Sequence, residues 1–206
     1  GSGGRAINSS SGAISLANST VSGNGNGIYG GSSTITLDAV TVTLNDVDGE
    51  GVGIDTSSGT ISMTHTIVAG HGQDCDVAAT TAQYSMDSDG SCGLAGAGNL
   101  SNANPLLGPL ANNGGPTLTH LPQVGSPAID SGSNGLCQAV DQRGVARPLD
   151  NPLPAVGLYQ DVECPADPVR QANRKRAAVT GSCGQRPAVL KFVERGIQRI
   201  QHRIPG

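Results

Sequence analysis

Three stretches of the chain, AISLANSTVSGN (13–24), TITLDAVTVTLN (34–45) and TISMTHTIVAGH (60–71), align with one another without a gap. Each has an isoleucine at its second position, a leucine or methionine at its fourth and a valine at its ninth. A further isoleucine lies seven residues before the first of these positions, at Ile7, Ile28 and Ile54. The alternating, β-branched character of the stretches indicates short strands, and turns rich in Gly, Asn and Asp separate them.

A repeat of this kind cannot bury its apolar face alone, but stacking places isoleucine on isoleucine and valine on valine. The sequence therefore predicts an all-β fold, a right-handed parallel β-helix of about four short rungs. Val77 and Tyr84 keep the seven-residue step and predict part of the fourth rung. We expect the rungs to occupy residues 1–97.

The rest of the chain divides into two further segments. Residues 98–164 are rich in Pro, Gly and Asn and predict a loop-rich, disulfide-tied closing segment. Residues 165–206 form a basic tail, in which apolar residues three and four apart predict one amphipathic helix, at Leu190, Val193, Ile197, Ile200 and Ile204. This helix is expected to cover the open end of the β-helix, and contact with an anionic membrane is the alternative.

The charge of the chain is unevenly distributed. The formal net charge is −4, but residues 1–164 carry a net −11 and residues 165–206 a net +7. Aromatic residues make up 2% of the chain, and Trp is absent, so the core must consist of small aliphatic side chains. We expect no nucleic-acid partner, and contact with a membrane only through the basic tail.

Five cysteines are spread along the chain without the spacing that zinc sites need. They predict disulfides in an oxidising compartment, and hence a secreted or cell-surface protein. Cys75 and Cys92 are expected to pair with each other, because they lie in one rung-sized segment. Cys137 is expected to pair with Cys164 or with Cys183, and the sequence does not choose between them.

Polar side chains recur at matching places of the repeat. Asp46, Asp48 and Glu50 could bring carboxylates onto one calcium ion, although Asp and Asn also cap the backbone of tight turns. No other cofactor is expected. Outward hydroxyls predict two ladders that cover the sheet, or bind ice or a sugar polymer, at Ser15/Thr36/Ser62 and at Thr20/Thr41. A third ladder, within the turns, is predicted at Asn24, Asn45 and His71.

One part of the chain resembles a known family. The string YSMDSDGSCGLAGAGNLSNANPLLGPLANNGGPTLTHLPQVGSPAIDSG (84–132), followed by Cys137 and by DQRGVARP (141–148), is similar to the C-terminal part of bacterial choice-of-anchor Q proteins of the CSLREA type. These resemble polymorphic outer-membrane-protein repeats and share the parallel β-helix of pectate lyases. The resemblance implies a secreted surface protein with a C-terminal anchor and no established catalytic residues. The chain departs from the family at residues 156–160, where a closing motif with two acidic positions is absent.

These observations favour a non-catalytic surface module for adhesion, with a glycan or a surface protein as its partner. The alternatives are a polysaccharide lyase or other carbohydrate-active enzyme and a purely structural spacer. A lyase would need a basic residue to take a proton, but no Lys or Arg lies between Ala6 and Gly115. We therefore assign no catalytic residue and interpret Asp141 and Arg143 as a structural ion pair that locks a turn.

Overall fold

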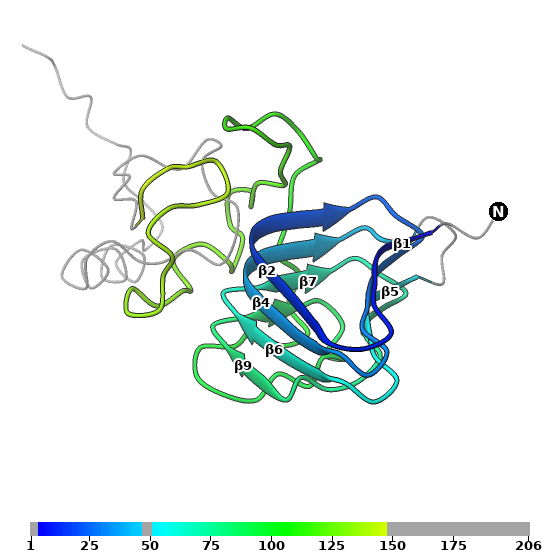
Figure 1. The fold of residues 1–206 in the computed structure, drawn as a ribbon. Helices are drawn as coiled ribbons and strands as arrows, with labels where there is room; N and C mark the ends of the chain where they lie inside the picture. Colours follow the sequence, from blue (N-terminus) through cyan, green and yellow to red (C-terminus); the bar gives the residue numbers. More distant parts are fainter. Residues whose placement is uncertain (1–3, 47–50, 148–206) are drawn as a thin grey trace, which may run out of the picture.

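The protein has an all-β fold with two parallel sheets (Figure 1). The computed structural model describes residues 4–46 and 51–147, and these contain no helix. None of them therefore forms a helix long and apolar enough to span a membrane. The basic tail and its predicted helix lie outside the described residues, as do residues 148–164 of the predicted closing segment.

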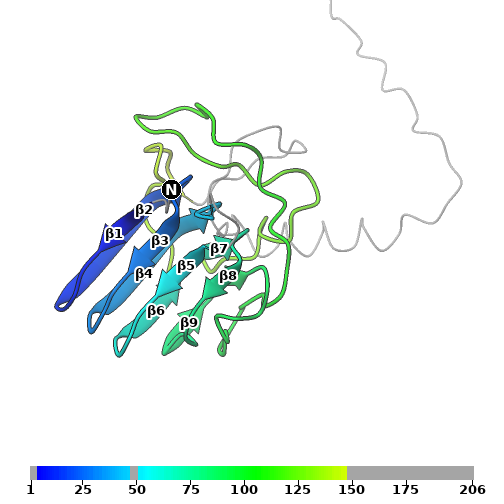
Figure 2. The same ribbon diagram turned by 90° about the vertical axis from the view of Figure 1, so that its right-hand side faces the viewer.

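The chain passes alternately from one sheet to the other. Sheet A has the order β1-β3-β5-β8, with the bounds Arg5–Asn8, Asn26–Tyr29, Val52–Asp55 and Gln73–Cys75. Sheet B consists of β2 (Ala13–Ser22), β4 (Thr34–Thr43), β6 (Thr60–Thr64), β7 (Ile67–Ala69), β9 (Thr81–Gln83) and β10 (Met86–Asp87). We call one strand of sheet A with the following strands of sheet B a circuit. Successive circuits lie beside one another in Figure 2.

The residues that align in the sequence are direct partners in the sheets. Ile14 pairs with Ile35, which in turn pairs with Ile61. The same holds for the other aligned positions, in the columns Leu16/Leu37/Met63, Val21/Val42/Val68 and Ile7/Ile28/Ile54. These side chains form one apolar cluster between the sheets. Similar aliphatic side chains therefore stack on one another across the strands. The β-branched ones among them have few rotamers, so the cluster can pack tightly with few aromatic residues.

Sheet B bends at one residue in each circuit. Asn18, Ala39, His65 and Tyr84 occupy matching places, and each has a left-handed backbone with φ between 45° and 56°. A left-handed residue reverses the alternation of side chains and turns the strand. It divides sheet B into a first limb, ending at residues 17, 38, 64 and 83, and a second limb, beginning at residues 19, 40, 66 and 85.

The fourth circuit forms with a different register from the one expected. Cys75 pairs with Ile54, Ala82 pairs with Met63, and Asp87 pairs with Val68. Val77 and Tyr84 do belong to the fourth circuit, but Val77 packs beside the first apolar cluster and Tyr84 lies at the bend, so neither occupies the column position that the seven-residue step implies. A shorter connection between the strands shifts the aligned positions by two residues or more. The small Cys75 and Ala82 therefore lie in the columns of Ile54 and Met63.

Residues 98–147 lie against the outer side of the second limb, and we call them the cover segment. They are joined mainly by turns and isolated bridges. A second apolar cluster forms where they meet the sheet, with Ile67, Ala69 and Met86 on the sheet side and Ala128 on the cover side. The second limb is therefore covered on both faces, whereas the first limb keeps one face toward solvent.

His65 joins the bend of sheet B to the cover segment. Its Nε2 accepts a hydrogen bond from the backbone N–H of Ser133 at 2.9 Å, and its ring stacks on Tyr84. Burial lowers the pKa of His65 below its usual 6.5; Asp38 opposes this shift, and Arg147 adds to it. A neutral imidazole is thus part of the folded state.

We expect this histidine to make the fold sensitive to acid. The unfolded chain takes up a proton near the usual pKa and the folded chain only at lower pH, so stability is full above about pH 6.5 and falls below it. His65→Gln should reduce the slope between pH 7.5 and 5, because a glutamine oxygen can still accept from Ser133. Denaturant unfolding at several pH values measures this, and equal slopes for both proteins would contradict it.

Candidate functional site

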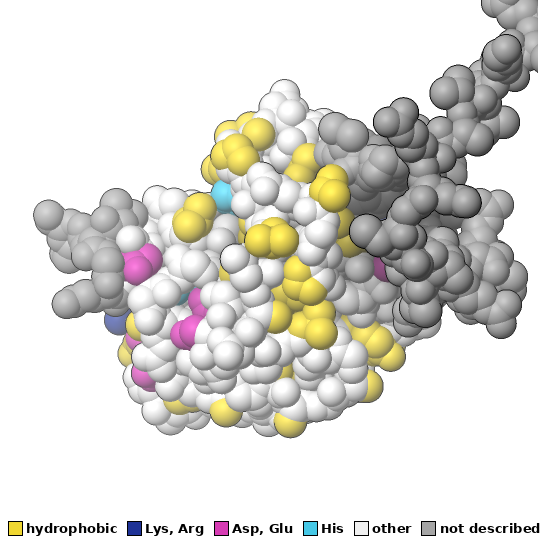
Figure 3. Space-filling model, turned by 180° about the vertical axis from the view of Figure 1, so that it is seen from behind, with side chains coloured by type: hydrophobic (Ala, Val, Ile, Leu, Met, Phe, Trp, Pro, Cys, Tyr) yellow, Lys and Arg dark blue, Asp and Glu magenta, His cyan; other side chains and the backbone are white. Residues whose placement is uncertain are grey.

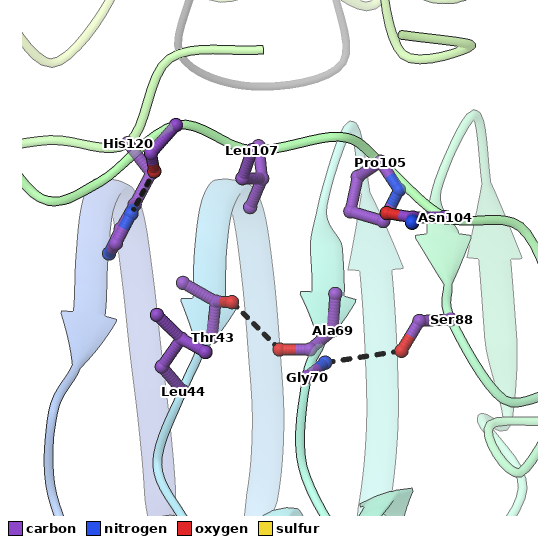
Figure 4. A pocket seen from close by; sticks show the side chains of 10 residues that line it. Thr43, Leu44, Ala69, Gly70, Ser88, Asn104, Pro105, Leu107 and His120 are labelled. Atoms are coloured by element: carbon purple, nitrogen blue, oxygen red, sulfur yellow. Dashed lines mark hydrogen bonds between the residues drawn. The ribbon is translucent and has the colours of Figure 1, made fainter. Parts of the chain in front are cut away.

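A pocket of about 360 Å³ lies between the ends of the second-limb strands and the cover segment. Strand ends supply Thr43, Leu44, Ala69, Gly70 and Ser88, and the cover segment supplies Asn104, Pro105, Leu107, Gly108 and His120. Figure 4 shows Leu107 and Pro105 above the pocket and the strand ends below it. Its volume is in the range of small-molecule sites.

The walls of the pocket carry no charged side chain. Thr43 donates its hydroxyl proton to the carbonyl oxygen of Ala69 at 2.7 Å, and Ser88 Oγ accepts from the Gly70 amide at 3.1 Å. Asn104 uses its Oδ1 to accept from the amide of Leu106 at 2.9 Å. Its Nδ2 donates no hydrogen bond to the part of the chain that the structure describes, so two N–H donors remain available.

His120 fixes the cover segment to the edge strand β2. Its Nδ1 donates to the carbonyl oxygen of Gly108 at 2.7 Å, and its Nε2 forms a hydrogen bond with the hydroxyl of Ser22 at 2.8 Å. A hydroxyl, an imidazole and a group that orients it form the pattern of an activated nucleophile. A nucleophile would also need nearby amides that stabilise an oxyanion, but the neighbouring Gly23 amide donates to the carbonyl oxygen of Leu44. Ser22 also does not line the pocket. We therefore interpret the pair as a clamp that holds one pocket wall.

Leu44 has a left-handed backbone at the rim of this pocket. Thr43, the residue before it, pairs with Ser22 on one side and with Ala69 on the other. The residues that directly follow these three form a second column, which consists of Gly23, Leu44 and Gly70. The three φ angles are 77°, 53° and 74° for Gly23, Leu44 and Gly70. The leucine is 54% exposed. Sequence reasoning did not single out Leu44, Asn104 or His120, because no local pattern relates the strand ends to the cover segment.

One of the two predicted hydroxyl ladders lies on the surface. Ser15, Thr36, Ser62 and Thr81 pair in sequence across the first limb, and Thr81 donates to Ser62 at 2.9 Å. The other ladder lies beneath the cover segment, contrary to expectation. Thr20 there donates to Gln142 at 2.7 Å, and Thr41 is 1% exposed. The two ladders differ in exposure because the cover segment packs only on the second limb.

The predicted turn ladder is present and continues into the fourth circuit. Asn24 Nδ2 donates to Asn45 Oδ1 at 2.8 Å, and Asn45 Nδ2 lies 3.4 Å from His71 Nε2. His71 Nδ1 in turn lies 2.9 Å from an Asp74 oxygen, and Asp74 accepts from Ser88. The chain of bonds satisfies buried polar groups at the strand ends beneath the pocket.

The calcium prediction stays untested. Asp46 Oδ1 accepts from the backbone amide of Gly51 at 2.5 Å, whereas Asp48 and Glu50 lie outside the described residues. Within residues 4–46 and 51–147, His, Cys, Asp and Glu side chains form no group of three or more that could hold a metal ion. The observed contact of Asp46 is that of a turn residue.

The cysteines partly follow the expectation. Cys75 and Cys92 form a disulfide, which joins the last strand of sheet A to the turn after β10. Cys137 is also disulfide-bonded. Its two candidate partners, Cys164 and Cys183, lie outside the described residues, so the choice between them stays a prediction.

Asp141 and Arg143 form the expected ion pair. Asp141 Oδ2 accepts from Arg143 Nε at 2.8 Å, and Asp141 Oδ1 accepts from the backbone amides of Arg143 and Val145. Both side chains are almost fully buried. Gly115 leaves room for them, because a Cβ there would lie 2.5 Å from Arg143 Cα. The motif therefore locks a turn of the cover segment.

Comparison with known proteins adds no relative. No family model, no curated protein and no solved structure matches the chain. The resemblance to choice-of-anchor Q proteins therefore stays a prediction from the sequence.

We expect Asp141→Asn to destabilise the protein by roughly 3 kcal/mol, because it removes the carboxylate that pairs with the buried Arg143 guanidinium. The amide oxygen can still serve the turn, so the loss reports on the charge. Urea unfolding measures the difference. The double variant with Arg143→Gln should recover part of the loss, and a single variant within about 0.5 kcal/mol of the wild type would contradict the buried-pair argument.

Proposed function

We propose that the chain is a non-catalytic module of a secreted or cell-surface protein that binds an uncharged glycan. The observation that carries this proposal is the outer face of the first limb. It displays hydroxyls from four adjacent strands, and the cover segment leaves it open. We call this surface the hydroxyl face and define it by Ser15, Thr36, Ser62 and Thr81.

The scaffold that we propose is a right-handed parallel β-helix of about four rungs. Its support is the alternation of the chain between two parallel sheets over four circuits. Crossover connections between parallel strands of one sheet are right-handed in almost all proteins. Such a scaffold keeps the hydroxyl face flat and rigid, and residues in one column lie about 4.8 Å apart.

The chemistry of the hydroxyl face suits a neutral polymer. Hydroxyls both donate and accept hydrogen bonds, and they repeat along the scaffold as sugar hydroxyls repeat along a glycan. Asp38 lies on β4 two residues after Thr36, and its carboxylate accepts from Gln138 of the cover segment. Figure 3 shows the side of the molecule behind the view of Figure 1, where Asp and Glu side chains and hydrophobic patches lie on the surface. Many weak contacts along one polymer add up through effective concentration.

Two observations support an extracellular location. Disulfides persist in oxidising compartments, and the described residues include Cys75–Cys92 and a bonded Cys137. The resemblance of residues 84–148 to choice-of-anchor Q proteins also favours a surface protein with a C-terminal anchor. Together with the hydroxyl face, the disulfides and this resemblance favour a role in adhesion over that of a polysaccharide lyase.

We expect Thr36→Lys to weaken glycan binding by roughly tenfold or more, because it places a long charged side chain in the middle of the hydroxyl face. Binding to insoluble neutral polysaccharides and to a glycan array measures this. Ala95→Lys adds the same charge on an exposed loop and should leave binding unchanged. A wild-type protein that binds none of these glycans, or that degrades a polyuronate, would refute the proposal.

A further inference from the structure

We propose that the pocket beside Leu44 is a second site, separate from the hydroxyl face, for a neutral and partly apolar ligand of about the size of one sugar unit. Leu44 is its specificity-determining residue. The choice of a sugar as the ligand class rests on the proposed function. The site itself rests on the geometry of the pocket, on the backbone of Leu44 and on the free donors of Asn104.

Leu44 stands where the fold favours glycine. Its partners in the column, Gly23 and Gly70, have the same left-handed backbone. A side chain with a Cβ is disfavoured in this conformation, whereas glycine adopts it readily. The same conflict between residue and backbone occurs at Ala39 and Tyr84, where it forms the bend, but of the described non-glycine residues with this backbone Leu44 alone lines the pocket.

The fold gains little from the side chain of Leu44. The backbone hydrogen bonds of this residue, from its amide to Ala69 and from Gly23 to its carbonyl, would form with any non-proline residue. The side chain is 54% exposed, and it lies over the bare backbone of Gly70, where a Cβ would be 3.3 Å from Leu44 Cδ2. The leucine thus keeps an apolar surface at the rim of a pocket, available to a ligand.

The walls define the chemistry of that ligand. Leu44, Leu107 and Pro105 offer apolar surface, and Asn104 offers two N–H donors on the same pocket (Figure 4). A sugar ring has a hydrocarbon face and acceptor oxygens at its edge, which match these two features. A charged ligand would lose hydration without meeting an opposite charge. His120 keeps its wall in place through Gly108 and Ser22.

Leucine variants separate the contact from the strain. Leu44→Gly removes both the side chain and the strain, so we expect an unfolding midpoint equal to or above that of the wild type, with sugar binding weakened roughly tenfold. Leu44→Ala removes the contact but retains a Cβ, so it should bind as weakly and be less stable than Leu44→Gly. A Leu44→Gly protein that is less stable than the wild type would show that the leucine serves the fold and overturn its assignment.

An asparagine pair tests the polar contact. Asn104→Asp keeps the oxygen that accepts from Leu106 but removes both N–H donors, so sugar binding should be lost. Asn112→Asp is the matched control, because Asn112 accepts from the Gly114 amide in the same way and does not line the pocket. It should bind as the wild type does.

The probes are glucose, galactose, mannose and N-acetylglucosamine, with glucuronate as the charged counterpart, observed by ligand NMR. Binding of at least one neutral sugar that the Leu44 and Asn104 variants lose supports the site. No binding of any neutral sugar, preference for glucuronate, or binding that these variants retain overturns it. Polysaccharide binding that Thr36→Lys abolishes would still stand in that case, so the failures of the two sites are distinguishable.

Discussion

The structure depends on the pairing of matching aliphatic residues on adjacent parallel strands. Ile35 lies between Ile14 and Ile61, and Val42 lies between Val21 and Val68. With 2% aromatic residues, the chain cannot fill a thick core. It brings its two sheets together around small side chains, each of which touches its like in the next circuit. A shift of one residue would turn the whole column to solvent, so this packing sets the register of every strand.

A single left-handed residue in each circuit gives sheet B its two limbs, and the limbs have different roles. The second limb is covered by residues 98–147, which bury Ile67 and Met86 on its outer face. The first limb stays open and presents hydroxyls. The cover is attached by histidines at two places, since His65 accepts from Ser133 and His120 bonds to Ser22. Burial lowers the pKa of His65, which favours the neutral ring that accepts from Ser133.

The pocket exists because the ends of the strands and the cover segment leave a space that neither fills. Buried polar groups beneath it are paired through the turn ladder of Asn24, Asn45 and His71, so this part of the fold is satisfied without a ligand. Among the described residues that line the pocket, Leu44 is the one non-glycine residue with a left-handed backbone, and its side chain is half exposed. The contrast between a satisfied scaffold and one unfavourable rim residue is the physical basis for assigning a site there.

The sequence alone determined the parallel pairing of the first three circuits, because a period of two and recurring isoleucines and valines are local patterns that survive folding. It also determined the Cys75–Cys92 bond and the Asp141–Arg143 turn, whose partners lie close along the chain. Only the tertiary structure decided the register of the fourth circuit, where Cys75 and Ala82 replace the repeating residues. It also decided which ladder is exposed and where the pocket lies. The contact of Ser22 with His120 spans 98 positions without any periodicity, so packing of the whole chain, rather than a local pattern, brings such residues together.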